Sequence, residues 1–218
     1  MKTTLSLTYI ALLITLLFCV NGVSAQEKLL VDDFENGLSS SWSTKSFEGK
    51  TIYTIVNDAG GRVLQAVSNS SASGLIFARK IDLTKHPILS WRWKIENIIE
   101  QGDARNKSTD DYAARIYITF PHWYYPKTTS LNYIWANQLP KGENIPSPFT
   151  ENSRMFAVES GADMVGHWMH IQRNMVEDYR QAFGKEPPRT AILSIMSDTE
   201  NTRSKARAWY DDIFLLSE

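Results

Sequence analysis

Residues 111–120 read DYAARIYITF, and their apolar and polar side chains alternate with the period of two that a half-buried β-strand requires. Residues 88–95, ILSWRWKI, repeat the pattern. Each segment therefore predicts a strand with one face in a core and the other toward solvent. The expected core faces are Tyr112, Ala114, Ile116, Ile118 and Phe120, and Leu89, Trp91, Trp93 and Ile95. The opposite faces carry Asp111, Ala113, Arg115, Tyr117 and Thr119, and Ser90, Arg92 and Lys94.

These polar faces form the first candidate binding surface. If the two strands pair, Arg92 and Arg115 lie on one surface near Asp111, with Tyr117 on the same face. Guanidinium groups beside a carboxylate and a tyrosine can hold hydroxyl groups or an acidic ligand. A cross-strand ladder of ion pairs is the alternative, and the residues alone leave both interpretations open.

The chain after residue 25 consists of short apolar or alternating runs separated by clusters of Gly, Ser, Asn, Asp or Pro. Many short strands with turn signals between them predict an all-β fold, an antiparallel β-sandwich of jelly-roll type. Val, Ile, Tyr, Phe and Trp dominate the strands, as a pleated and half-buried surface prefers. The further expected strands are 29–34, 51–56, 62–67, 75–80, 131–136, 155–159, 168–173, 190–196 and 207–215.

One short helix is expected at 175–183. Asn174 can cap its first turn, and Glu177 stands where it can complete a capping box. The helical period places Val176, Tyr179 and Phe183 on one face. Gly184 ends the helix, because a C-terminal glycine readily adopts the left-handed conformation.

The stretch 120–154 contains five prolines and predicts long loops, where binding surfaces usually sit. Within it, Asn132, Tyr133 and Trp135 combine two aromatic rings with an amide, as sugar sites do. Tyr133 and Trp135 are two residues apart, so both can equally point into the core.

Two further polar concentrations are Arg173, next to the helix cap, and the segment 198–202, which begins with Asp198. Asp and Asn after a strand commonly build turns. A loop that faces the ligand is the alternative, because the segment is acidic and rich in amides but contains no glycine.

Acidic residues stand at both ends of the predicted domain. The sequence Asp32-Asp33-Phe34-Glu35 lies in the first strand, and Asp211 and Asp212 lie in the last. The first and last strands of a jelly roll often lie side by side, which would gather Asp33, Glu35, Asp211 and Asp212. Clustered carboxylates repel unless a hard cation joins them, so a structural calcium site is a hypothesis here. Independent solvated carboxylates are the alternative.

The first 25 residues read as a signal peptide. Lys2 precedes an apolar run of residues 5–20, and Val23-Ser24-Ala25 predicts cleavage before Gln26. A retained membrane anchor and lipidation of Cys19 are the alternatives. Cleavage leaves residues 26–218 as a single domain without cysteine, which indicates a bacterial periplasmic or secreted protein with no stable membrane anchor.

Charge and motifs exclude several classes. Removal of Lys2 leaves 22 basic against 24 acidic residues, a net charge of −2, which does not favour a nucleic-acid partner. The sequence contains no nucleophile elbow, no HExxH and no phosphate loop. Acid–base chemistry by a pair of carboxylates, as in glycosidases, stays open.

Several quoted segments occur in an order that resembles a known family. They are WRWK at 91–94, DDYAARIY at 110–117, LNYIW at 131–135, VESG at 158–161, MSDT at 196–199 and AWYDDI at 208–213. The mature chain is similar to the exported bacterial family called "domain of unknown function 3047". The resemblance implies no activity. The two chain ends are also similar to those of carbohydrate-binding modules with the galactose-binding-like jelly roll, which suggests the fold.

The sequence therefore predicts noncatalytic binding of a glycan or another polar ligand on the polar sheet face. The candidate ligand-binding residues are Arg92, Asp111, Arg115, Tyr117, Asn132, Tyr133, Trp135, Arg173 and Asp198. Two alternatives come from other classes. One is a carbohydrate hydrolase or lyase with Asp111, Arg115 and Asp198 in its active site, and the other is an envelope domain that contacts another protein.

Overall fold

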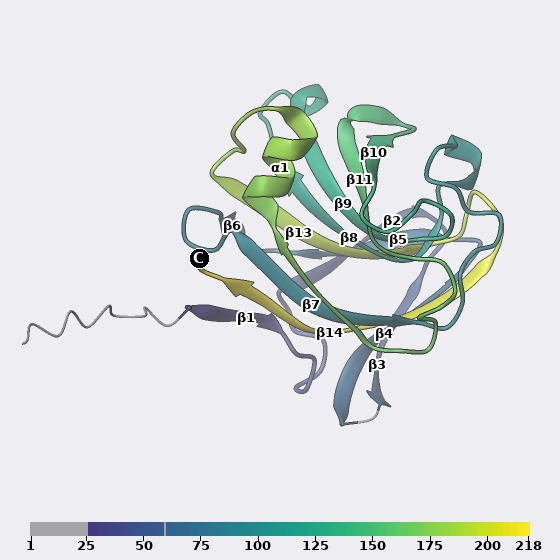
Figure 1. Cartoon of the computed structure of the whole chain (residues 1–218). Coiled ribbons are helices and arrows are strands. Elements are labelled where there is room, and N and C mark those ends of the chain that lie inside the picture. Colours follow the sequence, from purple (N-terminus) through teal and green to yellow (C-terminus); the bar gives the residue numbers. More distant parts are fainter. Residues whose placement is uncertain (1–25, 59) are drawn as a thin grey trace, which may run out of the picture.

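Two β-sheets face each other in a computed structural model that describes residues 26–58 and 60–218 (Figure 1). The predicted signal peptide lies outside the described residues. The six-stranded sheet has the order β12 (Met169–Asn174), β7 (Ile88–Ile95), β14 (Lys205–Leu216), β4 (Gly61–Asn69) and β3 (Ile52–Asp58), and β1 (Lys28–Asp32) also pairs with β14. No described helix is long and apolar enough to span a membrane.

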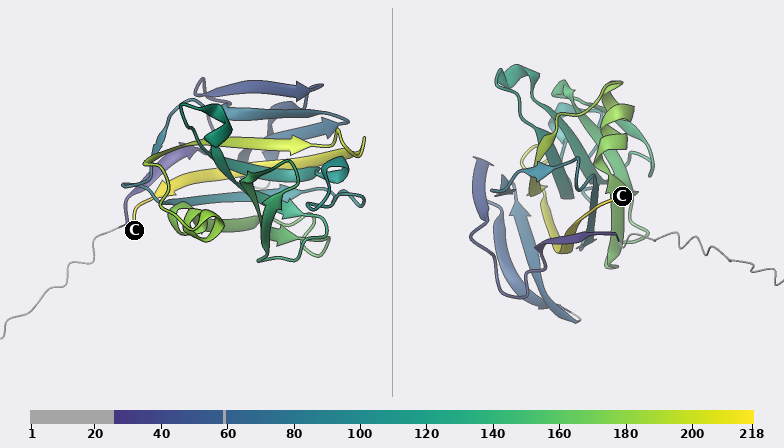
Figure 2. Two further views of the ribbon diagram at one scale, coloured as in Figure 1. Left: turned by 90° about the horizontal axis from the view of Figure 1, so that it is seen from above. Right: turned by 90° about the vertical axis from the view of Figure 1, so that its left-hand side faces the viewer.

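The eight-stranded sheet forms the second layer, and both layers are seen edge-on in the right view of Figure 2. Its order is β10 (Asn144–Ser147), β11 (Thr150–Ser160), β9 (Thr129–Ala136), β8 (Tyr112–Phe120), β13 (Thr190–Asp198), β5 (Ala72–Phe77) and β2 (Trp42–Glu48), and the short β6 (Ile81–Asp82) also pairs with β13. The predicted β-sandwich of jelly-roll type is confirmed. One pair departs from the antiparallel expectation, because β9 and β11 run parallel.

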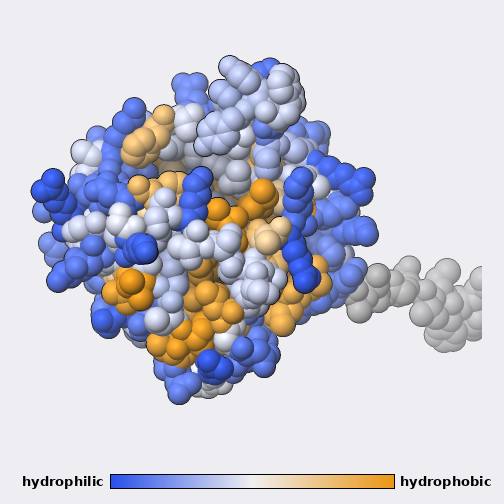
Figure 3. Space-filling model, turned by 180° about the vertical axis from the view of Figure 1, so that it is seen from behind, coloured by the Kyte–Doolittle hydropathy of each residue, from blue (hydrophilic) through white to orange (hydrophobic). Residues whose placement is uncertain are grey.

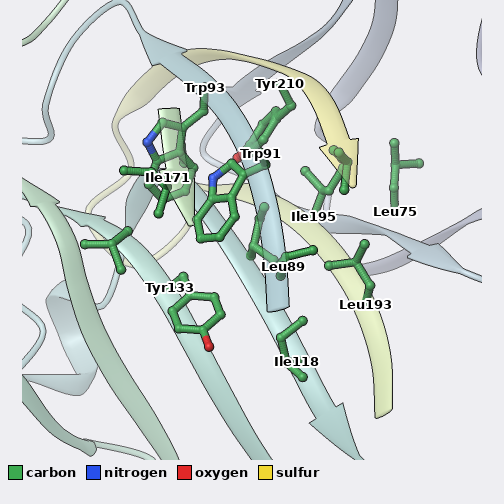
Figure 4. Close-up of a cluster of buried hydrophobic side chains, with 14 of the residues drawn as sticks. Leu75, Leu89, Trp91, Trp93, Ile118, Tyr133, Ile171, Leu193, Ile195 and Tyr210 are labelled. Carbon is green, nitrogen blue, oxygen red and sulfur yellow. The ribbon is translucent and has the colours of Figure 1, made fainter. Parts of the chain in front are cut away.

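Large aromatic side chains fill the space between the sheets. Trp91 of β7 stacks on Tyr133 of β9 with ring centroids 5.5 Å apart, and it meets Trp93 edge-on (Figure 4). Trp93 in turn contacts Trp135 and Tyr210. All of these side chains are buried, so Tyr133 and Trp135 belong to the core and not to the rim of a sugar site.

The strands 88–95 and 112–120 have the predicted bounds, but they do not pair. β7 lies between β12 and β14 in one sheet, whereas β8 lies between β9 and β13 in the other. The prediction that Arg92 and Arg115 lie on one surface is therefore wrong. The two strands point their apolar faces at each other across the core, which sends their polar faces to opposite sides of the sandwich.

The helix α1 (Met175–Phe183) has the predicted bounds and caps. The Asn174 side chain accepts hydrogen bonds from the amides of Val176 and Glu177, and Gly184 ends the helix in the left-handed conformation. Asp178 fixes the helix to the core, because its carboxylate accepts hydrogen bonds from the Tyr133 hydroxyl, at 2.8 Å, and from the Arg173 guanidinium. Arg173 thus positions the helix and is tied to a buried partner.

The predicted neighbourhood of the first and last strands is confirmed, because β1 pairs with β14. The four carboxylates expected there do not gather into one group among the described residues. Asp211 and Asp212 both pair with Arg92, while Glu35 accepts a hydrogen bond from the Arg62 amide. Asp33 accepts a hydrogen bond from the Glu35 amide, so each of the four carboxylates has a partner.

Replacement of Asp178 by alanine tests the attachment of α1. The variant leaves the Arg173 guanidinium and the Tyr133 hydroxyl without their acceptor, so we expect the free energy of unfolding to fall by about 2–3 kcal/mol. Glu186→Ala is the matched control, since it breaks an ion pair of two exposed side chains with Arg180 and should cost far less than Asp178→Ala. Equal losses in urea unfolding would contradict this role of Asp178.

Candidate ligand-binding face

The outer face of the eight-stranded sheet is the candidate binding face. Arg115 and Tyr117 point outward there, because Ile116 and Ile118, the residues that alternate with them, belong to the core. Strand register places Tyr117 opposite Asn132 of β9 and Ser194 of β13. The left view of Figure 2 looks onto this side, where β2, β5 and β13 run next to one another.

Loops cover one half of this face. Ala104 and Leu139, from the segments before β8 and after β9, pack on Ile134 and Met155 in a second, smaller apolar cluster. The other half stays open to solvent and is here named the open strip. Its outward side chains are Ser43, Ile76, Tyr117, Thr119, Ser130 and Ser194, all of them partly or fully exposed.

A register shift redirects Tyr112 to this face. The pairing of β8 with β13 shifts between Met196 and Asp198, so β8 has one extra residue there. Ala113 and Ala114 consequently both contact the main core, whereas Tyr112 joins the outer cluster. Strict alternation predicts Tyr112 in the core, because the alternation of residues does not indicate where a bulge occurs.

Arg115 is the centre of a buried charge cluster at one end of the open strip. Its side chain is 5% exposed, and Nη2 lies 2.5 Å from Oδ2 of Asp198 while Nη1 lies 3.6 Å from Oδ2 of Asp110. The rings of Tyr112 and Tyr117 lie on either side of the guanidinium at 5.2 and 4.8 Å. Burial raises the pKa of both Asp110 and Asp198, and the Arg115 charge opposes that rise.

Asp111 has a structural task beside this cluster. Its carboxylate accepts hydrogen bonds from the amide and side chain of Asn201 and from the amide and hydroxyl of Thr202. These bonds hold the turn that connects β13 to β14. Because its acceptor positions are occupied, Asp111 supports the site from below and is not free to meet a ligand.

Asp111, Asp198 and Glu200 form the one group of three potential metal-ligating side chains found in residues 26–58 and 60–218. Burial, followed by the charge of Asp111, raises the pKa of Glu200 to about 6. Several buried polar atoms here have no hydrogen-bond partner, which is uncommon in folded proteins. They are Nε of Arg115, Oδ1 of Asn132, Oδ1 and Oδ2 of Asp198, and Oε2 of Glu200.

The structure therefore brings together five of the nine predicted ligand-binding residues on one face. They are Asp111, Arg115, Tyr117, Asn132 and Asp198. Arg92 lies on the outer face of the other sheet, where it pairs with Asp211 and Asp212 and lies over the Trp168 ring at 4.8 Å. For Arg92 the ion-pair ladder was the correct alternative.

Three exposed aromatic side chains are not among the residues that the sequence predicted for the site. Residues 121–126, PHWYYP, connect β8 to β9 and are here named the aromatic loop. Trp123 is 92% exposed, Tyr124 50% and Tyr125 81%. Three adjacent aromatic residues between two prolines are the signal that could have identified them. Figure 3 shows a pale projection at the top of the molecule, where Figure 1 places this loop.

Comparisons with known proteins agree with the resemblance in the sequence. The model of a family described as "Protein of unknown function (DUF3047)" matches residues 40–214. No curated protein matches the chain.

Several solved structures are similar to the chain. A family 30 carbohydrate-binding module of a cellulosomal cellulase of Clostridium thermocellum shares 13% identity at a TM-score of 0.47, over 88% of this chain and 98% of that chain. A cleaved adhesin domain of Lys-gingipain from Porphyromonas gingivalis shares 12% at 0.47, over 89% and 99%. A carbohydrate-binding module of the beta-sandwich superfamily shares 12% at 0.46, over 85% of this chain and 61% of that chain.

Glu200 makes stability depend on pH. Its pKa of about 6 in the folded protein exceeds the ordinary value of 4.5. The resulting stabilisation is fully present below the unfolded-state pKa and is lost as pH rises through the folded-state pKa. We expect the free energy of unfolding to fall between about pH 5 and about pH 7, and Glu200→Gln to flatten this decrease. Glu151→Gln, at the exposed start of β11, is the control. An unchanged slope of the free energy of unfolding against pH in Glu200→Gln would contradict the raised pKa of Glu200.

Proposed function

Because the chain belongs to the DUF3047 family, whose description assigns no activity, we propose from the geometry that the protein binds a glycan or a similar polar ligand on the open strip. The observation that carries this proposal is the composition of the strip. Hydroxyl groups of Thr119, Ser130 and Ser194 lie next to the partly exposed ring of Tyr117, and that of Ser43 lies further along the strip on β2. A ring for the apolar face of a sugar and hydroxyls for its polar groups are what such a ligand requires.

The strip is also rigid, which supports binding. Its side chains project from the paired strands β2, β5, β13, β8 and β9, and they have few rotatable bonds, so they lose little conformational entropy on contact with a ligand. The buried cluster of Arg115 and Asp198 fixes the end of the strip, because these two groups hold each other. Binding without chemistry fits this arrangement, since Arg115 and Asp198 are buried beneath the strip.

We further propose that this binding takes place outside the cytoplasm, in the periplasm or in the medium. The support comes from residues 1–25, whose basic start, apolar run and small residues before Gln26 form a secretory signal. Cleavage would leave a domain without cysteine. Mass determination of the N-terminus of the exported protein tests this assignment.

Tyr117→Ala tests the proposed function. We expect a bound glycan, identified on an array and measured by calorimetry, to lose about tenfold or more in affinity, because the ring is the principal contact of the strip. Trp209→Ala is the matched control, since Trp209 is an aromatic residue on the outer face of the other sheet.

Three outcomes would contradict this proposal. The first is an unchanged affinity of Tyr117→Ala. The second is release of product from the glycan, which would indicate an enzyme. The third is copurification of a protein partner together with no affinity for any glycan, which would indicate an interaction domain.

A further inference from the structure

The aromatic loop presents three large rings to solvent on a fixed backbone. The amide of His122 donates to Oγ1 of Thr128 at 3.1 Å, and the amide of Tyr124 donates to Nδ1 of His122 at 3.0 Å. Asn152 of β11 donates from Nδ2 to the carbonyl of Pro126 at 2.7 Å. Exposed rings held in this way lose little conformational freedom when a ligand covers them.

A cavity of about 600 Å³ opens beside the aromatic loop. Its apolar lining comes from the buried rings of Phe120 and Tyr179, and its polar lining includes Asn152, Lys127 and Lys185. The cavity therefore places hydrogen-bond donors beside an apolar lining, to which Pro187 and Pro188 also contribute, and the rings that a ligand can reach are those of the aromatic loop. Lys127 comes directly after the aromatic loop, and Lys185 follows the end of α1.

The charge at this cavity is positive. Lys127 and Lys185 are exposed and form no ion pair with any residue of the described ranges 26–58 and 60–218. Glu186 is the one acidic group of the lining, and Arg180 pairs with it at 2.8 Å. Two ammonium groups consequently remain without a counter-charge.

The open strip is thus polarised from end to end. The acidic cluster of Asp110, Asp198 and Glu200 lies near Tyr112, where β8 begins, and the two lysines lie beyond Phe120, where β8 ends. Eight residue steps of about 3.3 Å separate these ends by about 26 Å. At the first end Arg115 pairs with Asp110 and Asp198, whereas at the second end two ammonium groups are unpaired, so an anionic ligand is attracted to the second end.

We propose that the aromatic loop and the neighbouring cavity select an acidic polysaccharide, with its sugar rings on Trp123 and Tyr125 and its anionic groups at Lys127 and Lys185. This inference rests on the proposed function and adds to it the chemical class of the ligand. Carboxylate and sulfate groups share the required negative charge, and both are acceptors for ammonium donors.

The test measures binding of the mature chain to matched acidic and neutral polymers. Polygalacturonate supplies carboxylates, its fully methyl-esterified form supplies the same backbone without charge, and chondroitin sulfate supplies sulfate as well. We expect the acidic forms to bind more tightly than the ester, and added salt to remove the difference. A preference for chondroitin sulfate over polygalacturonate identifies sulfate as the preferred anion, and the reverse identifies carboxylate.

Two variants separate stacking from charge. Trp123→Ala should lower the affinity for the acidic polymers about tenfold or more. The double variant Lys127→Gln with Lys185→Gln should lower it about three- to tenfold and abolish its salt dependence, with no effect on any binding of the ester. Phe149→Ala, at an exposed ring in the β10–β11 hairpin, and Lys50→Gln with Lys80→Gln are the matched controls.

The two proposals fail in different ways. Equal or tighter binding of neutral polymers, or full acidic-polymer affinity in the double lysine variant, overturns the selection of an acidic ligand and leaves glycan binding intact. Absence of binding to acidic and neutral glycans alike overturns the proposed function together with this inference. All variants exchange exposed side chains, so unchanged melting temperatures confirm that the fold persists.

Discussion

Burial of the β7 tryptophans between the two sheets is the constraint on which the rest of the structure depends. Trp91 and Trp93 are fully enclosed, and their rings contact Tyr133 and Trp135 of the facing sheet and Tyr210 of the neighbouring strand β14. Such large apolar surfaces contribute strongly to stability only when they meet a second apolar layer. This requirement places β7 and β8 in opposite sheets and turns the polar face of each toward solvent.

The two outer faces then have different roles. On the six-stranded sheet, Arg92 is occupied by Asp211 and Asp212 in an ion-pair ladder. On the eight-stranded sheet, Arg115 and Asp198 are buried as a pair at one end, and small hydroxyl side chains remain open beside Tyr117. A face with partly exposed hydroxyl groups can accept a ligand, whereas a ladder whose charges are already paired offers less.

In the proposed function, the open strip and the aromatic loop supply different contacts to the ligand. The strip supplies a row of hydroxyls on paired strands, and the loop supplies the exposed rings of Trp123 and Tyr125. Charge is distributed unevenly between the ends of this surface, with carboxylates at the start of β8 and lysines beyond its end. A long polar chain therefore has one preferred position on it.

Local chemistry in the sequence determined the strand bounds of 88–95 and 112–120, the helix at 175–183 and its caps, because periodicity and capping depend on neighbours in the chain. Only the tertiary structure decided which strands pair, since both sheets satisfy the same alternation. It separated Arg92 from Arg115, buried Tyr133 and Trp135, and used a bulge to bring Tyr112 to Arg115. The geometry of a binding site depends on which strands lie next to each other. The alternation of residues within one strand does not indicate its neighbours in the sandwich.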